Sequence, residues 1–87
     1  MNMLHKNTEI EQIVKERDQA FIDAVTKDDW QGVMKYAKKY GVRLSANKNI
    51  MKAAIYKAVQ CCTDIPEDVK ALAAQKCTEL GFNPTIM

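Results

Sequence analysis

The stretch WQGVMKYAKKYGVRLSANKNIMKAAIYKAVQCCT, residues 30–63, decides how this chain folds, because it holds two helical patterns and the signal that separates them. Apolar residues recur at steps of three and four in both halves, which predicts helices over about 29–40 and 48–62. Gly41 stands where a left-handed residue commonly ends a helix. The polar residues that follow Gly41 therefore form a loop between the two helices.

Two further helices are predicted on either side of this stretch. Thr8 and Glu11 have the spacing of a capping box, and Gly81 ends the last helix as Gly41 ends the second. Four helices of this kind predict an all-α fold. The expected architecture is one compact four-helix domain over 1–87, made of two helical hairpins over about 8–27, 29–40, 48–62 and 65–80, with residues 1–7 as a loose tail.

Side chains near the helix starts indicate how each helix is capped. Asp28 or Thr26 is expected to cap the second helix, and Asn47 or Ser45 the third, because short polar side chains accept hydrogen bonds from the free first-turn amides. Trp30 opens the apolar face of the second helix, beside the short connection from the first. We therefore expect Trp30 to be a mostly buried anchor between the first two helices.

Three further expectations concern the faces of the helices. The third helix is apolar over about half its circumference and should be central, leaving Lys52, Tyr56 and Gln60 to solvent. Gly32 falls on the outward side of the second helix, as a weak spot or a place where a partner backbone comes close. Arg17 interrupts the apolar face of the first helix, either with its stem over the core or in a buried ion pair.

Charge is strongly segregated along the chain, although the formal net charge is only +2. Residues 30–63 carry seven Lys and Arg without one Asp or Glu, whereas residues 1–29 sum to −3 and residues 64–87 to −2. A basic segment of this kind favours an acidic partner. The predicted partner-binding residues are Lys35, Lys38, Lys39, Arg43, Lys48, Asn49, Lys52 and Tyr56.

The sequence offers no pattern that is typical of an enzyme. The only histidine, His5, lies in the expected tail, and the only serine, Ser45, lies in a loop. Two acids at Asp28 and Asp29 are the expected complement to a helix dipole. We therefore expect no catalytic residue, no cofactor and no metal site.

The three cysteines are expected to be reduced, metal-free apolar core residues. Cys61 and Cys62 are adjacent and point about 100° apart on a helix, and Cys77 lies far along the next helix. An odd number of thiols suits a reducing compartment. With no signal peptide and no apolar run near the roughly 20 residues that span a bilayer, we expect a cytoplasmic protein without membrane contact.

Ala37 and Gly41, four residues apart, resemble the first helix and turn of a helix-turn-helix protein. That resemblance would make 48–62 a recognition helix, with Lys48, Asn49, Lys52 and Tyr56 facing the major groove, although the first inward aliphatic residue, Ile50, comes three residues late. A nucleic-acid binder is therefore the alternative. The first hypothesis is a small interaction module, regulator or inhibitor docking on an acidic protein surface, of the kind that phages and mobile elements encode, with oligomerisation left open.

Overall fold

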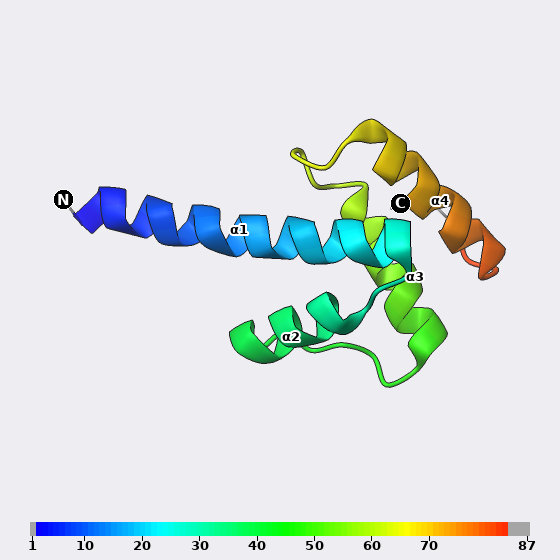
Figure 1. Cartoon of the computed structure of the whole chain (residues 1–87). Helices are drawn as coiled ribbons and strands as arrows, with labels where there is room; N and C mark the ends of the chain where they lie inside the picture. The colour runs from blue at the N-terminus through cyan, green and yellow to red at the C-terminus, as the bar shows by residue number, and fades with distance from the viewer. Residues whose placement is uncertain (1, 84–87) are drawn as a thin grey trace.

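A computed structural model describes residues 2–83 of the chain, and the side chains of residues 9–83. Its four helices are α1 (Asn2–Lys27), α2 (Gln31–Tyr40), α3 (Lys48–Val59) and α4 (Glu67–Glu79) (Figure 1). α1 packs against α2 and α3 packs against α4, so the predicted all-α fold of two helical hairpins is confirmed. Among residues 2–83, none of the helices combines the length and apolar character that a membrane crossing needs.

The central helix is α1, because it packs against each of the other three helices. The expectation that 48–62 would be central is therefore wrong. Figure 1 shows that the C-terminal half of α1 lies among the other helices while its N-terminal turns project beyond them. The apolar face of α1 follows this division, since Ala24 and Val25 are fully buried and Ile10 is 58% exposed.

The predicted start of the first helix near residue 8 is also corrected, because α1 already begins at Asn2. Residues 2–7 contain neither glycine nor proline, so nothing in them ends the helix. Thr8 consequently lies inside α1 rather than at its start, and its capping-box pattern is not used as a cap. Met1 lies outside the described residues.

Both glycine terminators behave as predicted. Gly41 and Gly81 have φ angles of 69° and 89°, in the left-handed region that glycine adopts without a Cβ clash. The amide of Val42 donates to the carbonyl of Ala37 at 2.8 Å, and the amide of Phe82 donates to that of Cys77 at 3.2 Å. These are the bonds of a Schellman ending, and they satisfy carbonyls that the helix leaves free.

The cap of α3 is predicted correctly, but the cap of α2 is not. The Asn47 side chain accepts from the amide of Ile50 at 3.1 Å. At α2, neither Thr26 nor Asp28 is the cap; the Asp29 carboxylate accepts from the amide of Gln31 at 3.1 Å. The two expected caps are engaged elsewhere: the Thr26 hydroxyl donates to the carbonyl of Ile22 at 2.7 Å, and the Asp28 carboxylate accepts from Nε1 of Trp30 at 2.8 Å.

Burial on α3 is rotated from the expected face. Tyr56, expected in solvent, is only 4% exposed, whereas Ile50 is 48% exposed and Ala54 is also exposed. Apolar residues cover so much of α3 that its own pattern leaves the rotation open, and packing against α1 and α4 decides it. The buried side chains of α3 are Met51, Ala53, Ile55, Tyr56 and Val59.

The three cysteines are free, but they do not share one environment. Cys62 and Cys77 are buried, as expected, and burial raises the pKa of the Cys62 thiol. Cys61 is exposed, so its assignment to the core is wrong. It lies in the turn just past the end of α3, where the helical pattern no longer fixes its direction.

Arg17 forms an ion pair with its neighbour Asp18, but this pair is only partly buried and so differs from the buried ion pair that was one of the two expectations. Its Nη2 lies 2.9 Å from Oδ1 of Asp18, and the side chain remains one-third exposed. Asp18 is 8% exposed, which sequence reasoning missed. The adjacent guanidinium compensates the buried carboxylate, because a charge taken out of water needs a partner.

Gly32 lies at the closest approach of α1 and α2, not on the outward side. A Cβ atom built on Gly32 would stand 3.4 Å from both Cα and Cβ of Ala20. We expect Gly32→Ala to change the free energy of unfolding by less than about 1 kcal/mol, because a methyl group just fits. Gly32→Leu should cost about 1–3 kcal/mol by forcing the helices apart, measured by urea denaturation. Equal stability of the two variants would contradict the close approach.

Candidate functional site

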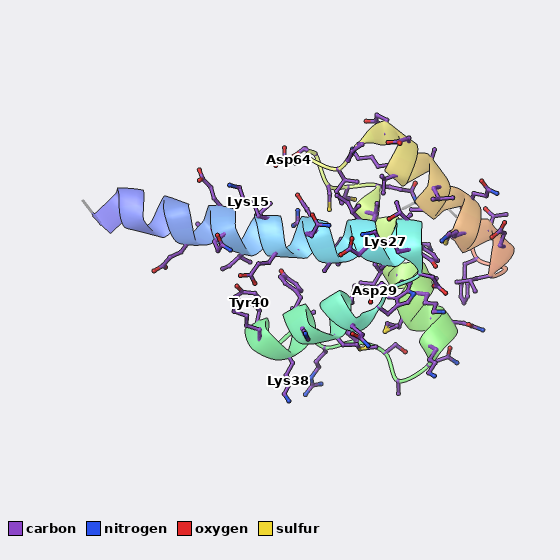
Figure 2. All side chains as sticks on the ribbon, in the orientation of Figure 1. Lys15, Lys27, Asp29, Lys38, Tyr40 and Asp64 are labelled. Carbon is purple, nitrogen blue, oxygen red and sulfur yellow. The ribbon has the colours of Figure 1, made fainter. Side chains whose placement is uncertain are left out.

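The outward side of α2 presents four exposed residues, Gln31, Met34, Lys35 and Lys38. They are spaced i, i+3, i+4 and i+7, so they form one continuous stripe along the helix. We call this stripe the α2 face. Figure 2 shows Lys38 pointing away from the domain, on the side of α2 opposite α1, while Tyr40 lies on the side nearer α1. The side of α2 that packs on α1 buries Val33 and Ala37 instead.

Most of the predicted basic residues are exposed. Within residues 9–83, none of Lys35, Lys38, Arg43 and Lys48 has a carboxylate within ion-pair distance. Lys35 and Lys38 share the α2 face, and Arg43 follows shortly after α2 ends. Lys48 and Asn49 lie in the first turn of α3, which does not pack against α2. The structure thus separates these cations into two groups.

Lys39 differs from its neighbours because it is bound within the chain. Its Nζ donates to the two carboxylate oxygens of Glu16 on α1 at 3.0 and 3.2 Å, and the Tyr40 hydroxyl donates to the same carboxylate at 2.8 Å. Lys39 is exposed like Lys35 and Lys38, but unlike them it is paired with a carboxylate of the chain. The helical wheel of α2 could not reveal a partner that lies 23 residues earlier in the chain.

The Glu16 cluster predicts a loss of stability in acid. Hydrogen bonds from Lys39, and then from Tyr40 and Gln12, lower the pKa of Glu16 from its ordinary 4.5. A lowered folded-state pKa stabilises the fold above pH 4.5, and this contribution is lost as pH falls through the lowered value. Between pH 7 and pH 3, the melting temperature of the wild type should therefore fall more than that of Glu16→Gln. Glu11→Gln, which changes an exposed carboxylate of α1, serves as the control, and its melting temperature should fall as much as that of the wild type.

Two predicted site residues face the interior rather than a partner. Tyr56 is buried, and its ring meets that of Trp30 edge-on, with centroids 5.6 Å apart. Lys52 is half-buried, and its Nζ lies 5.6 Å from the centroid of the Trp30 ring. Tyr56 therefore cannot serve as an exposed contact in this conformation, whereas Lys52 stays partly exposed. The ammonium group of Lys52 lies over the Trp30 ring, as is typical of a cation–π contact.

Trp30 is half-buried and fixed on several sides, but not as the expected anchor between α1 and α2. Its Nε1 donates to Oδ1 of Asp28 at 2.8 Å, and its ring packs against Tyr56 and Lys52 of α3. The hydrogen bond from Trp30, aided by the charge of Lys52, lowers the pKa of Asp28. Trp30 thus connects the α1–α2 turn to α3.

A shallow depression lies beside the α2 face, with a volume of about 520 Å³. Its lining residues are Asp28, Asp29, Trp30, Gln31, Met34 and Lys35. The depression is therefore acidic at the α1–α2 turn, apolar at its centre and basic towards the end of α2. Such a graded surface can hold an apolar side chain and orient charges on either side of it.

The partner-binding residues predicted from the sequence do not include Met34, which is 47% exposed. Taking Trp30 as the first residue of the apolar face placed Gly32 on the outward side of α2 and Met34 on the inner side. Val33 and Ala37, which are both buried, do not settle the orientation, because on a helical wheel centred between them Met34 lies about 80° away and Gly32 about 120° away. Packing on α1 decides that Gly32 turns inward and Met34 outward.

Among the residues that the structure describes, no three His, Cys, Asp or Glu side chains are grouped to hold a metal ion. No family model matches the chain, and searches of curated proteins and of solved structures returned no match. The function must therefore be argued from the α2 face and its depression.

Proposed function

We propose that this protein is a small, non-enzymatic interaction module, a regulator or inhibitor, that docks the α2 face on an acidic surface of a partner protein. The observation that carries the proposal is the exposure of Lys35 and Lys38 beside Met34, with no carboxylate of residues 9–83 to neutralise either cation. The proposed setting is the cytoplasm, where an exposed thiol such as that of Cys61 stays reduced.

The physical support comes from the mixture of charge and apolar surface. Two unpaired cations one turn apart attract acidic partners over a range of about 8–10 Å at physiological ionic strength. Met34 adds apolar area that a partner can remove from water, and interfaces commonly enclose an apolar centre in a polar rim.

Nucleic acid is the second candidate, supported by the exposure of Lys48 and Asn49 at the start of α3. Three observations weaken the helix-turn-helix form of this candidate. Tyr56, one of the residues assigned to the groove, is buried, and α3 does not pack against α2. The connection between these helices also spans residues 41–47, longer than the usual three- or four-residue turn.

Charge reversal on the α2 face tests the proposal. We expect Lys35→Glu/Lys38→Glu to weaken capture of partner proteins from host lysate by about tenfold or more, with melting temperature unchanged. Lys39 must stay unchanged, because a glutamate there would face Glu16. Lys15→Glu, which reverses an exposed lysine on α1, is matched to a Lys38→Glu single variant and should bind normally.

The same capture separates the two candidates. Complexes with protein should survive nuclease treatment, whereas nucleic-acid binding should be lost and should weaken log-linearly with salt, with a slope of about 0.9 per phosphate neutralised on duplex DNA. Equal capture by the double reversal and the wild type at low salt would overturn the proposed docking face.

A further inference from the structure

The α2 face has the geometry of one side of a helix–helix contact. Its four exposed positions cover two turns, about 10 Å along the axis at 1.5 Å per residue. Residues at this spacing form a ridge that packs into the groove of another helix. Within the described chain, however, no helix covers the ridge, because α2 packs only on α1, through its opposite side. The ridge is therefore open to a helix of another molecule.

Beside the ridge, the depression supplies a place for one apolar anchor. Trp30 and Met34 provide its apolar surface. The Trp30 ring is held by its bond to Asp28 and by contact with Tyr56, so little side-chain freedom remains to be lost when a ligand binds. Binding energy at interfaces concentrates in such pre-organised apolar positions.

The charges around the depression restrict what can lie over it. Asp28 and Asp29 border its end at the α1–α2 turn, and Lys35 and Lys38 lie in the opposite direction along α2. A uniformly anionic ligand such as a phosphate backbone would meet two carboxylates next to the lysines. A peptide segment avoids this repulsion when its carboxylates are confined to one side of its apolar anchor.

From these features we infer that the α2 face binds a short amphipathic helix of the partner. One apolar side chain of that helix enters the Trp30–Met34 depression, carboxylates spaced three or four residues apart contact Lys35 and Lys38, and an uncharged or basic residue faces Asp29. This inference rests on the proposed function. It narrows the partner surface from any acidic surface to a helical segment whose carboxylates lie on one side of its apolar anchor.

Selection from a displayed library of random 16-residue peptides against the full chain tests the inference. We expect enriched peptides to carry an apolar anchor with two carboxylates at helical spacing, and to gain helicity on binding. Because Trp30 is the only tryptophan of the chain, its fluorescence should change as these peptides bind. Enrichment of no peptide, or of peptides without this pattern, would overturn the inference.

Matched variants show whether the enriched peptides use the depression. Met34→Gln keeps the side-chain length and adds no charge. It should lower the affinity for the enriched peptides by about tenfold. Ile50→Gln changes a residue of nearly equal exposure on α3 and should leave affinity unchanged. Both variants must melt like the wild type.

The outcomes also distinguish failure of the inference from failure of the proposed function. The peptides could need Lys35 and Lys38 but bind Met34→Gln normally and leave Trp30 fluorescence unchanged. That result would support docking on the α2 face and contradict the insertion of an apolar side chain into the depression. If Lys35→Glu/Lys38→Glu binds the peptides as well as the wild type, both are wrong.

Discussion

Tyr56→Ala is expected to lower the free energy of unfolding by about 3–5 kcal/mol, the range for removing a buried aromatic side chain. Tyr56 is 4% exposed, and burial raises the pKa of its hydroxyl. Its ring meets Trp30 and lies in the cluster that α3 shares with α1 and α4. Domains of this size have only about 5–15 kcal/mol of stability, so the variant should be largely unfolded in mild urea.

The matched control is Tyr56→Phe, which keeps the ring and its packing. We expect it to stay within about 1 kcal/mol of the wild type, because only one hydroxyl is lost. Urea denaturation followed by far-UV circular dichroism measures both variants. If Tyr56→Ala unfolded at the wild-type midpoint, Tyr56 would be a surface residue and would return to the partner-binding set.

Trp30→Ala is the second variant with a large expected effect, about 2–4 kcal/mol. The value is smaller than for a fully buried tryptophan because Trp30 is half-buried. The loss combines its packing on Tyr56, the contact with Lys52 and the hydrogen bond to Asp28. Thermal and urea unfolding measure it.

Two comparisons assign this loss to its parts. Trp30→Phe keeps an aromatic ring but removes the bond to Asp28, so it should lose less than Trp30→Ala. A double-mutant cycle of Trp30→Ala with Tyr56→Ala should show a coupling of about 0.5–1.5 kcal/mol from the edge-on contact. Strict additivity of the two losses would mean that the rings do not stabilise each other.

These stability effects bear on how binding data should be interpreted. Trp30 lines the depression and also holds the α1–α2 turn to α3, so a Trp30 variant that fails to bind has two explanations. Met34 and Lys38 are exposed and make no such structural contact, which makes them the better residues for testing recognition. Lys39 is unsuitable for the same reason as Trp30, because it binds Glu16.

The structure changes the predicted set of partner-binding residues more than it changes the predicted fold. Lys35, Lys38, Arg43, Lys48 and Asn49 remain exposed candidates, whereas Lys39, Lys52 and Tyr56 are engaged within the chain. Lys39 is itself still exposed, and the structure adds an exposed apolar candidate, Met34. A charge count along the chain could not show this, because pairing depends on residues that are distant in sequence.

The sequence by itself determined the four helices and most of their ends, since periodicity, glycine terminators and the Asn47 cap act within a few residues of one another. Only the tertiary structure decided which side of α2 and α3 faces inward. A broad apolar arc defines a period but not a rotation, and the rotation follows from packing on α1. The approach of Gly32 to Ala20 and the binding of Lys39 to Glu16 arise only once α1 and α2 pack together.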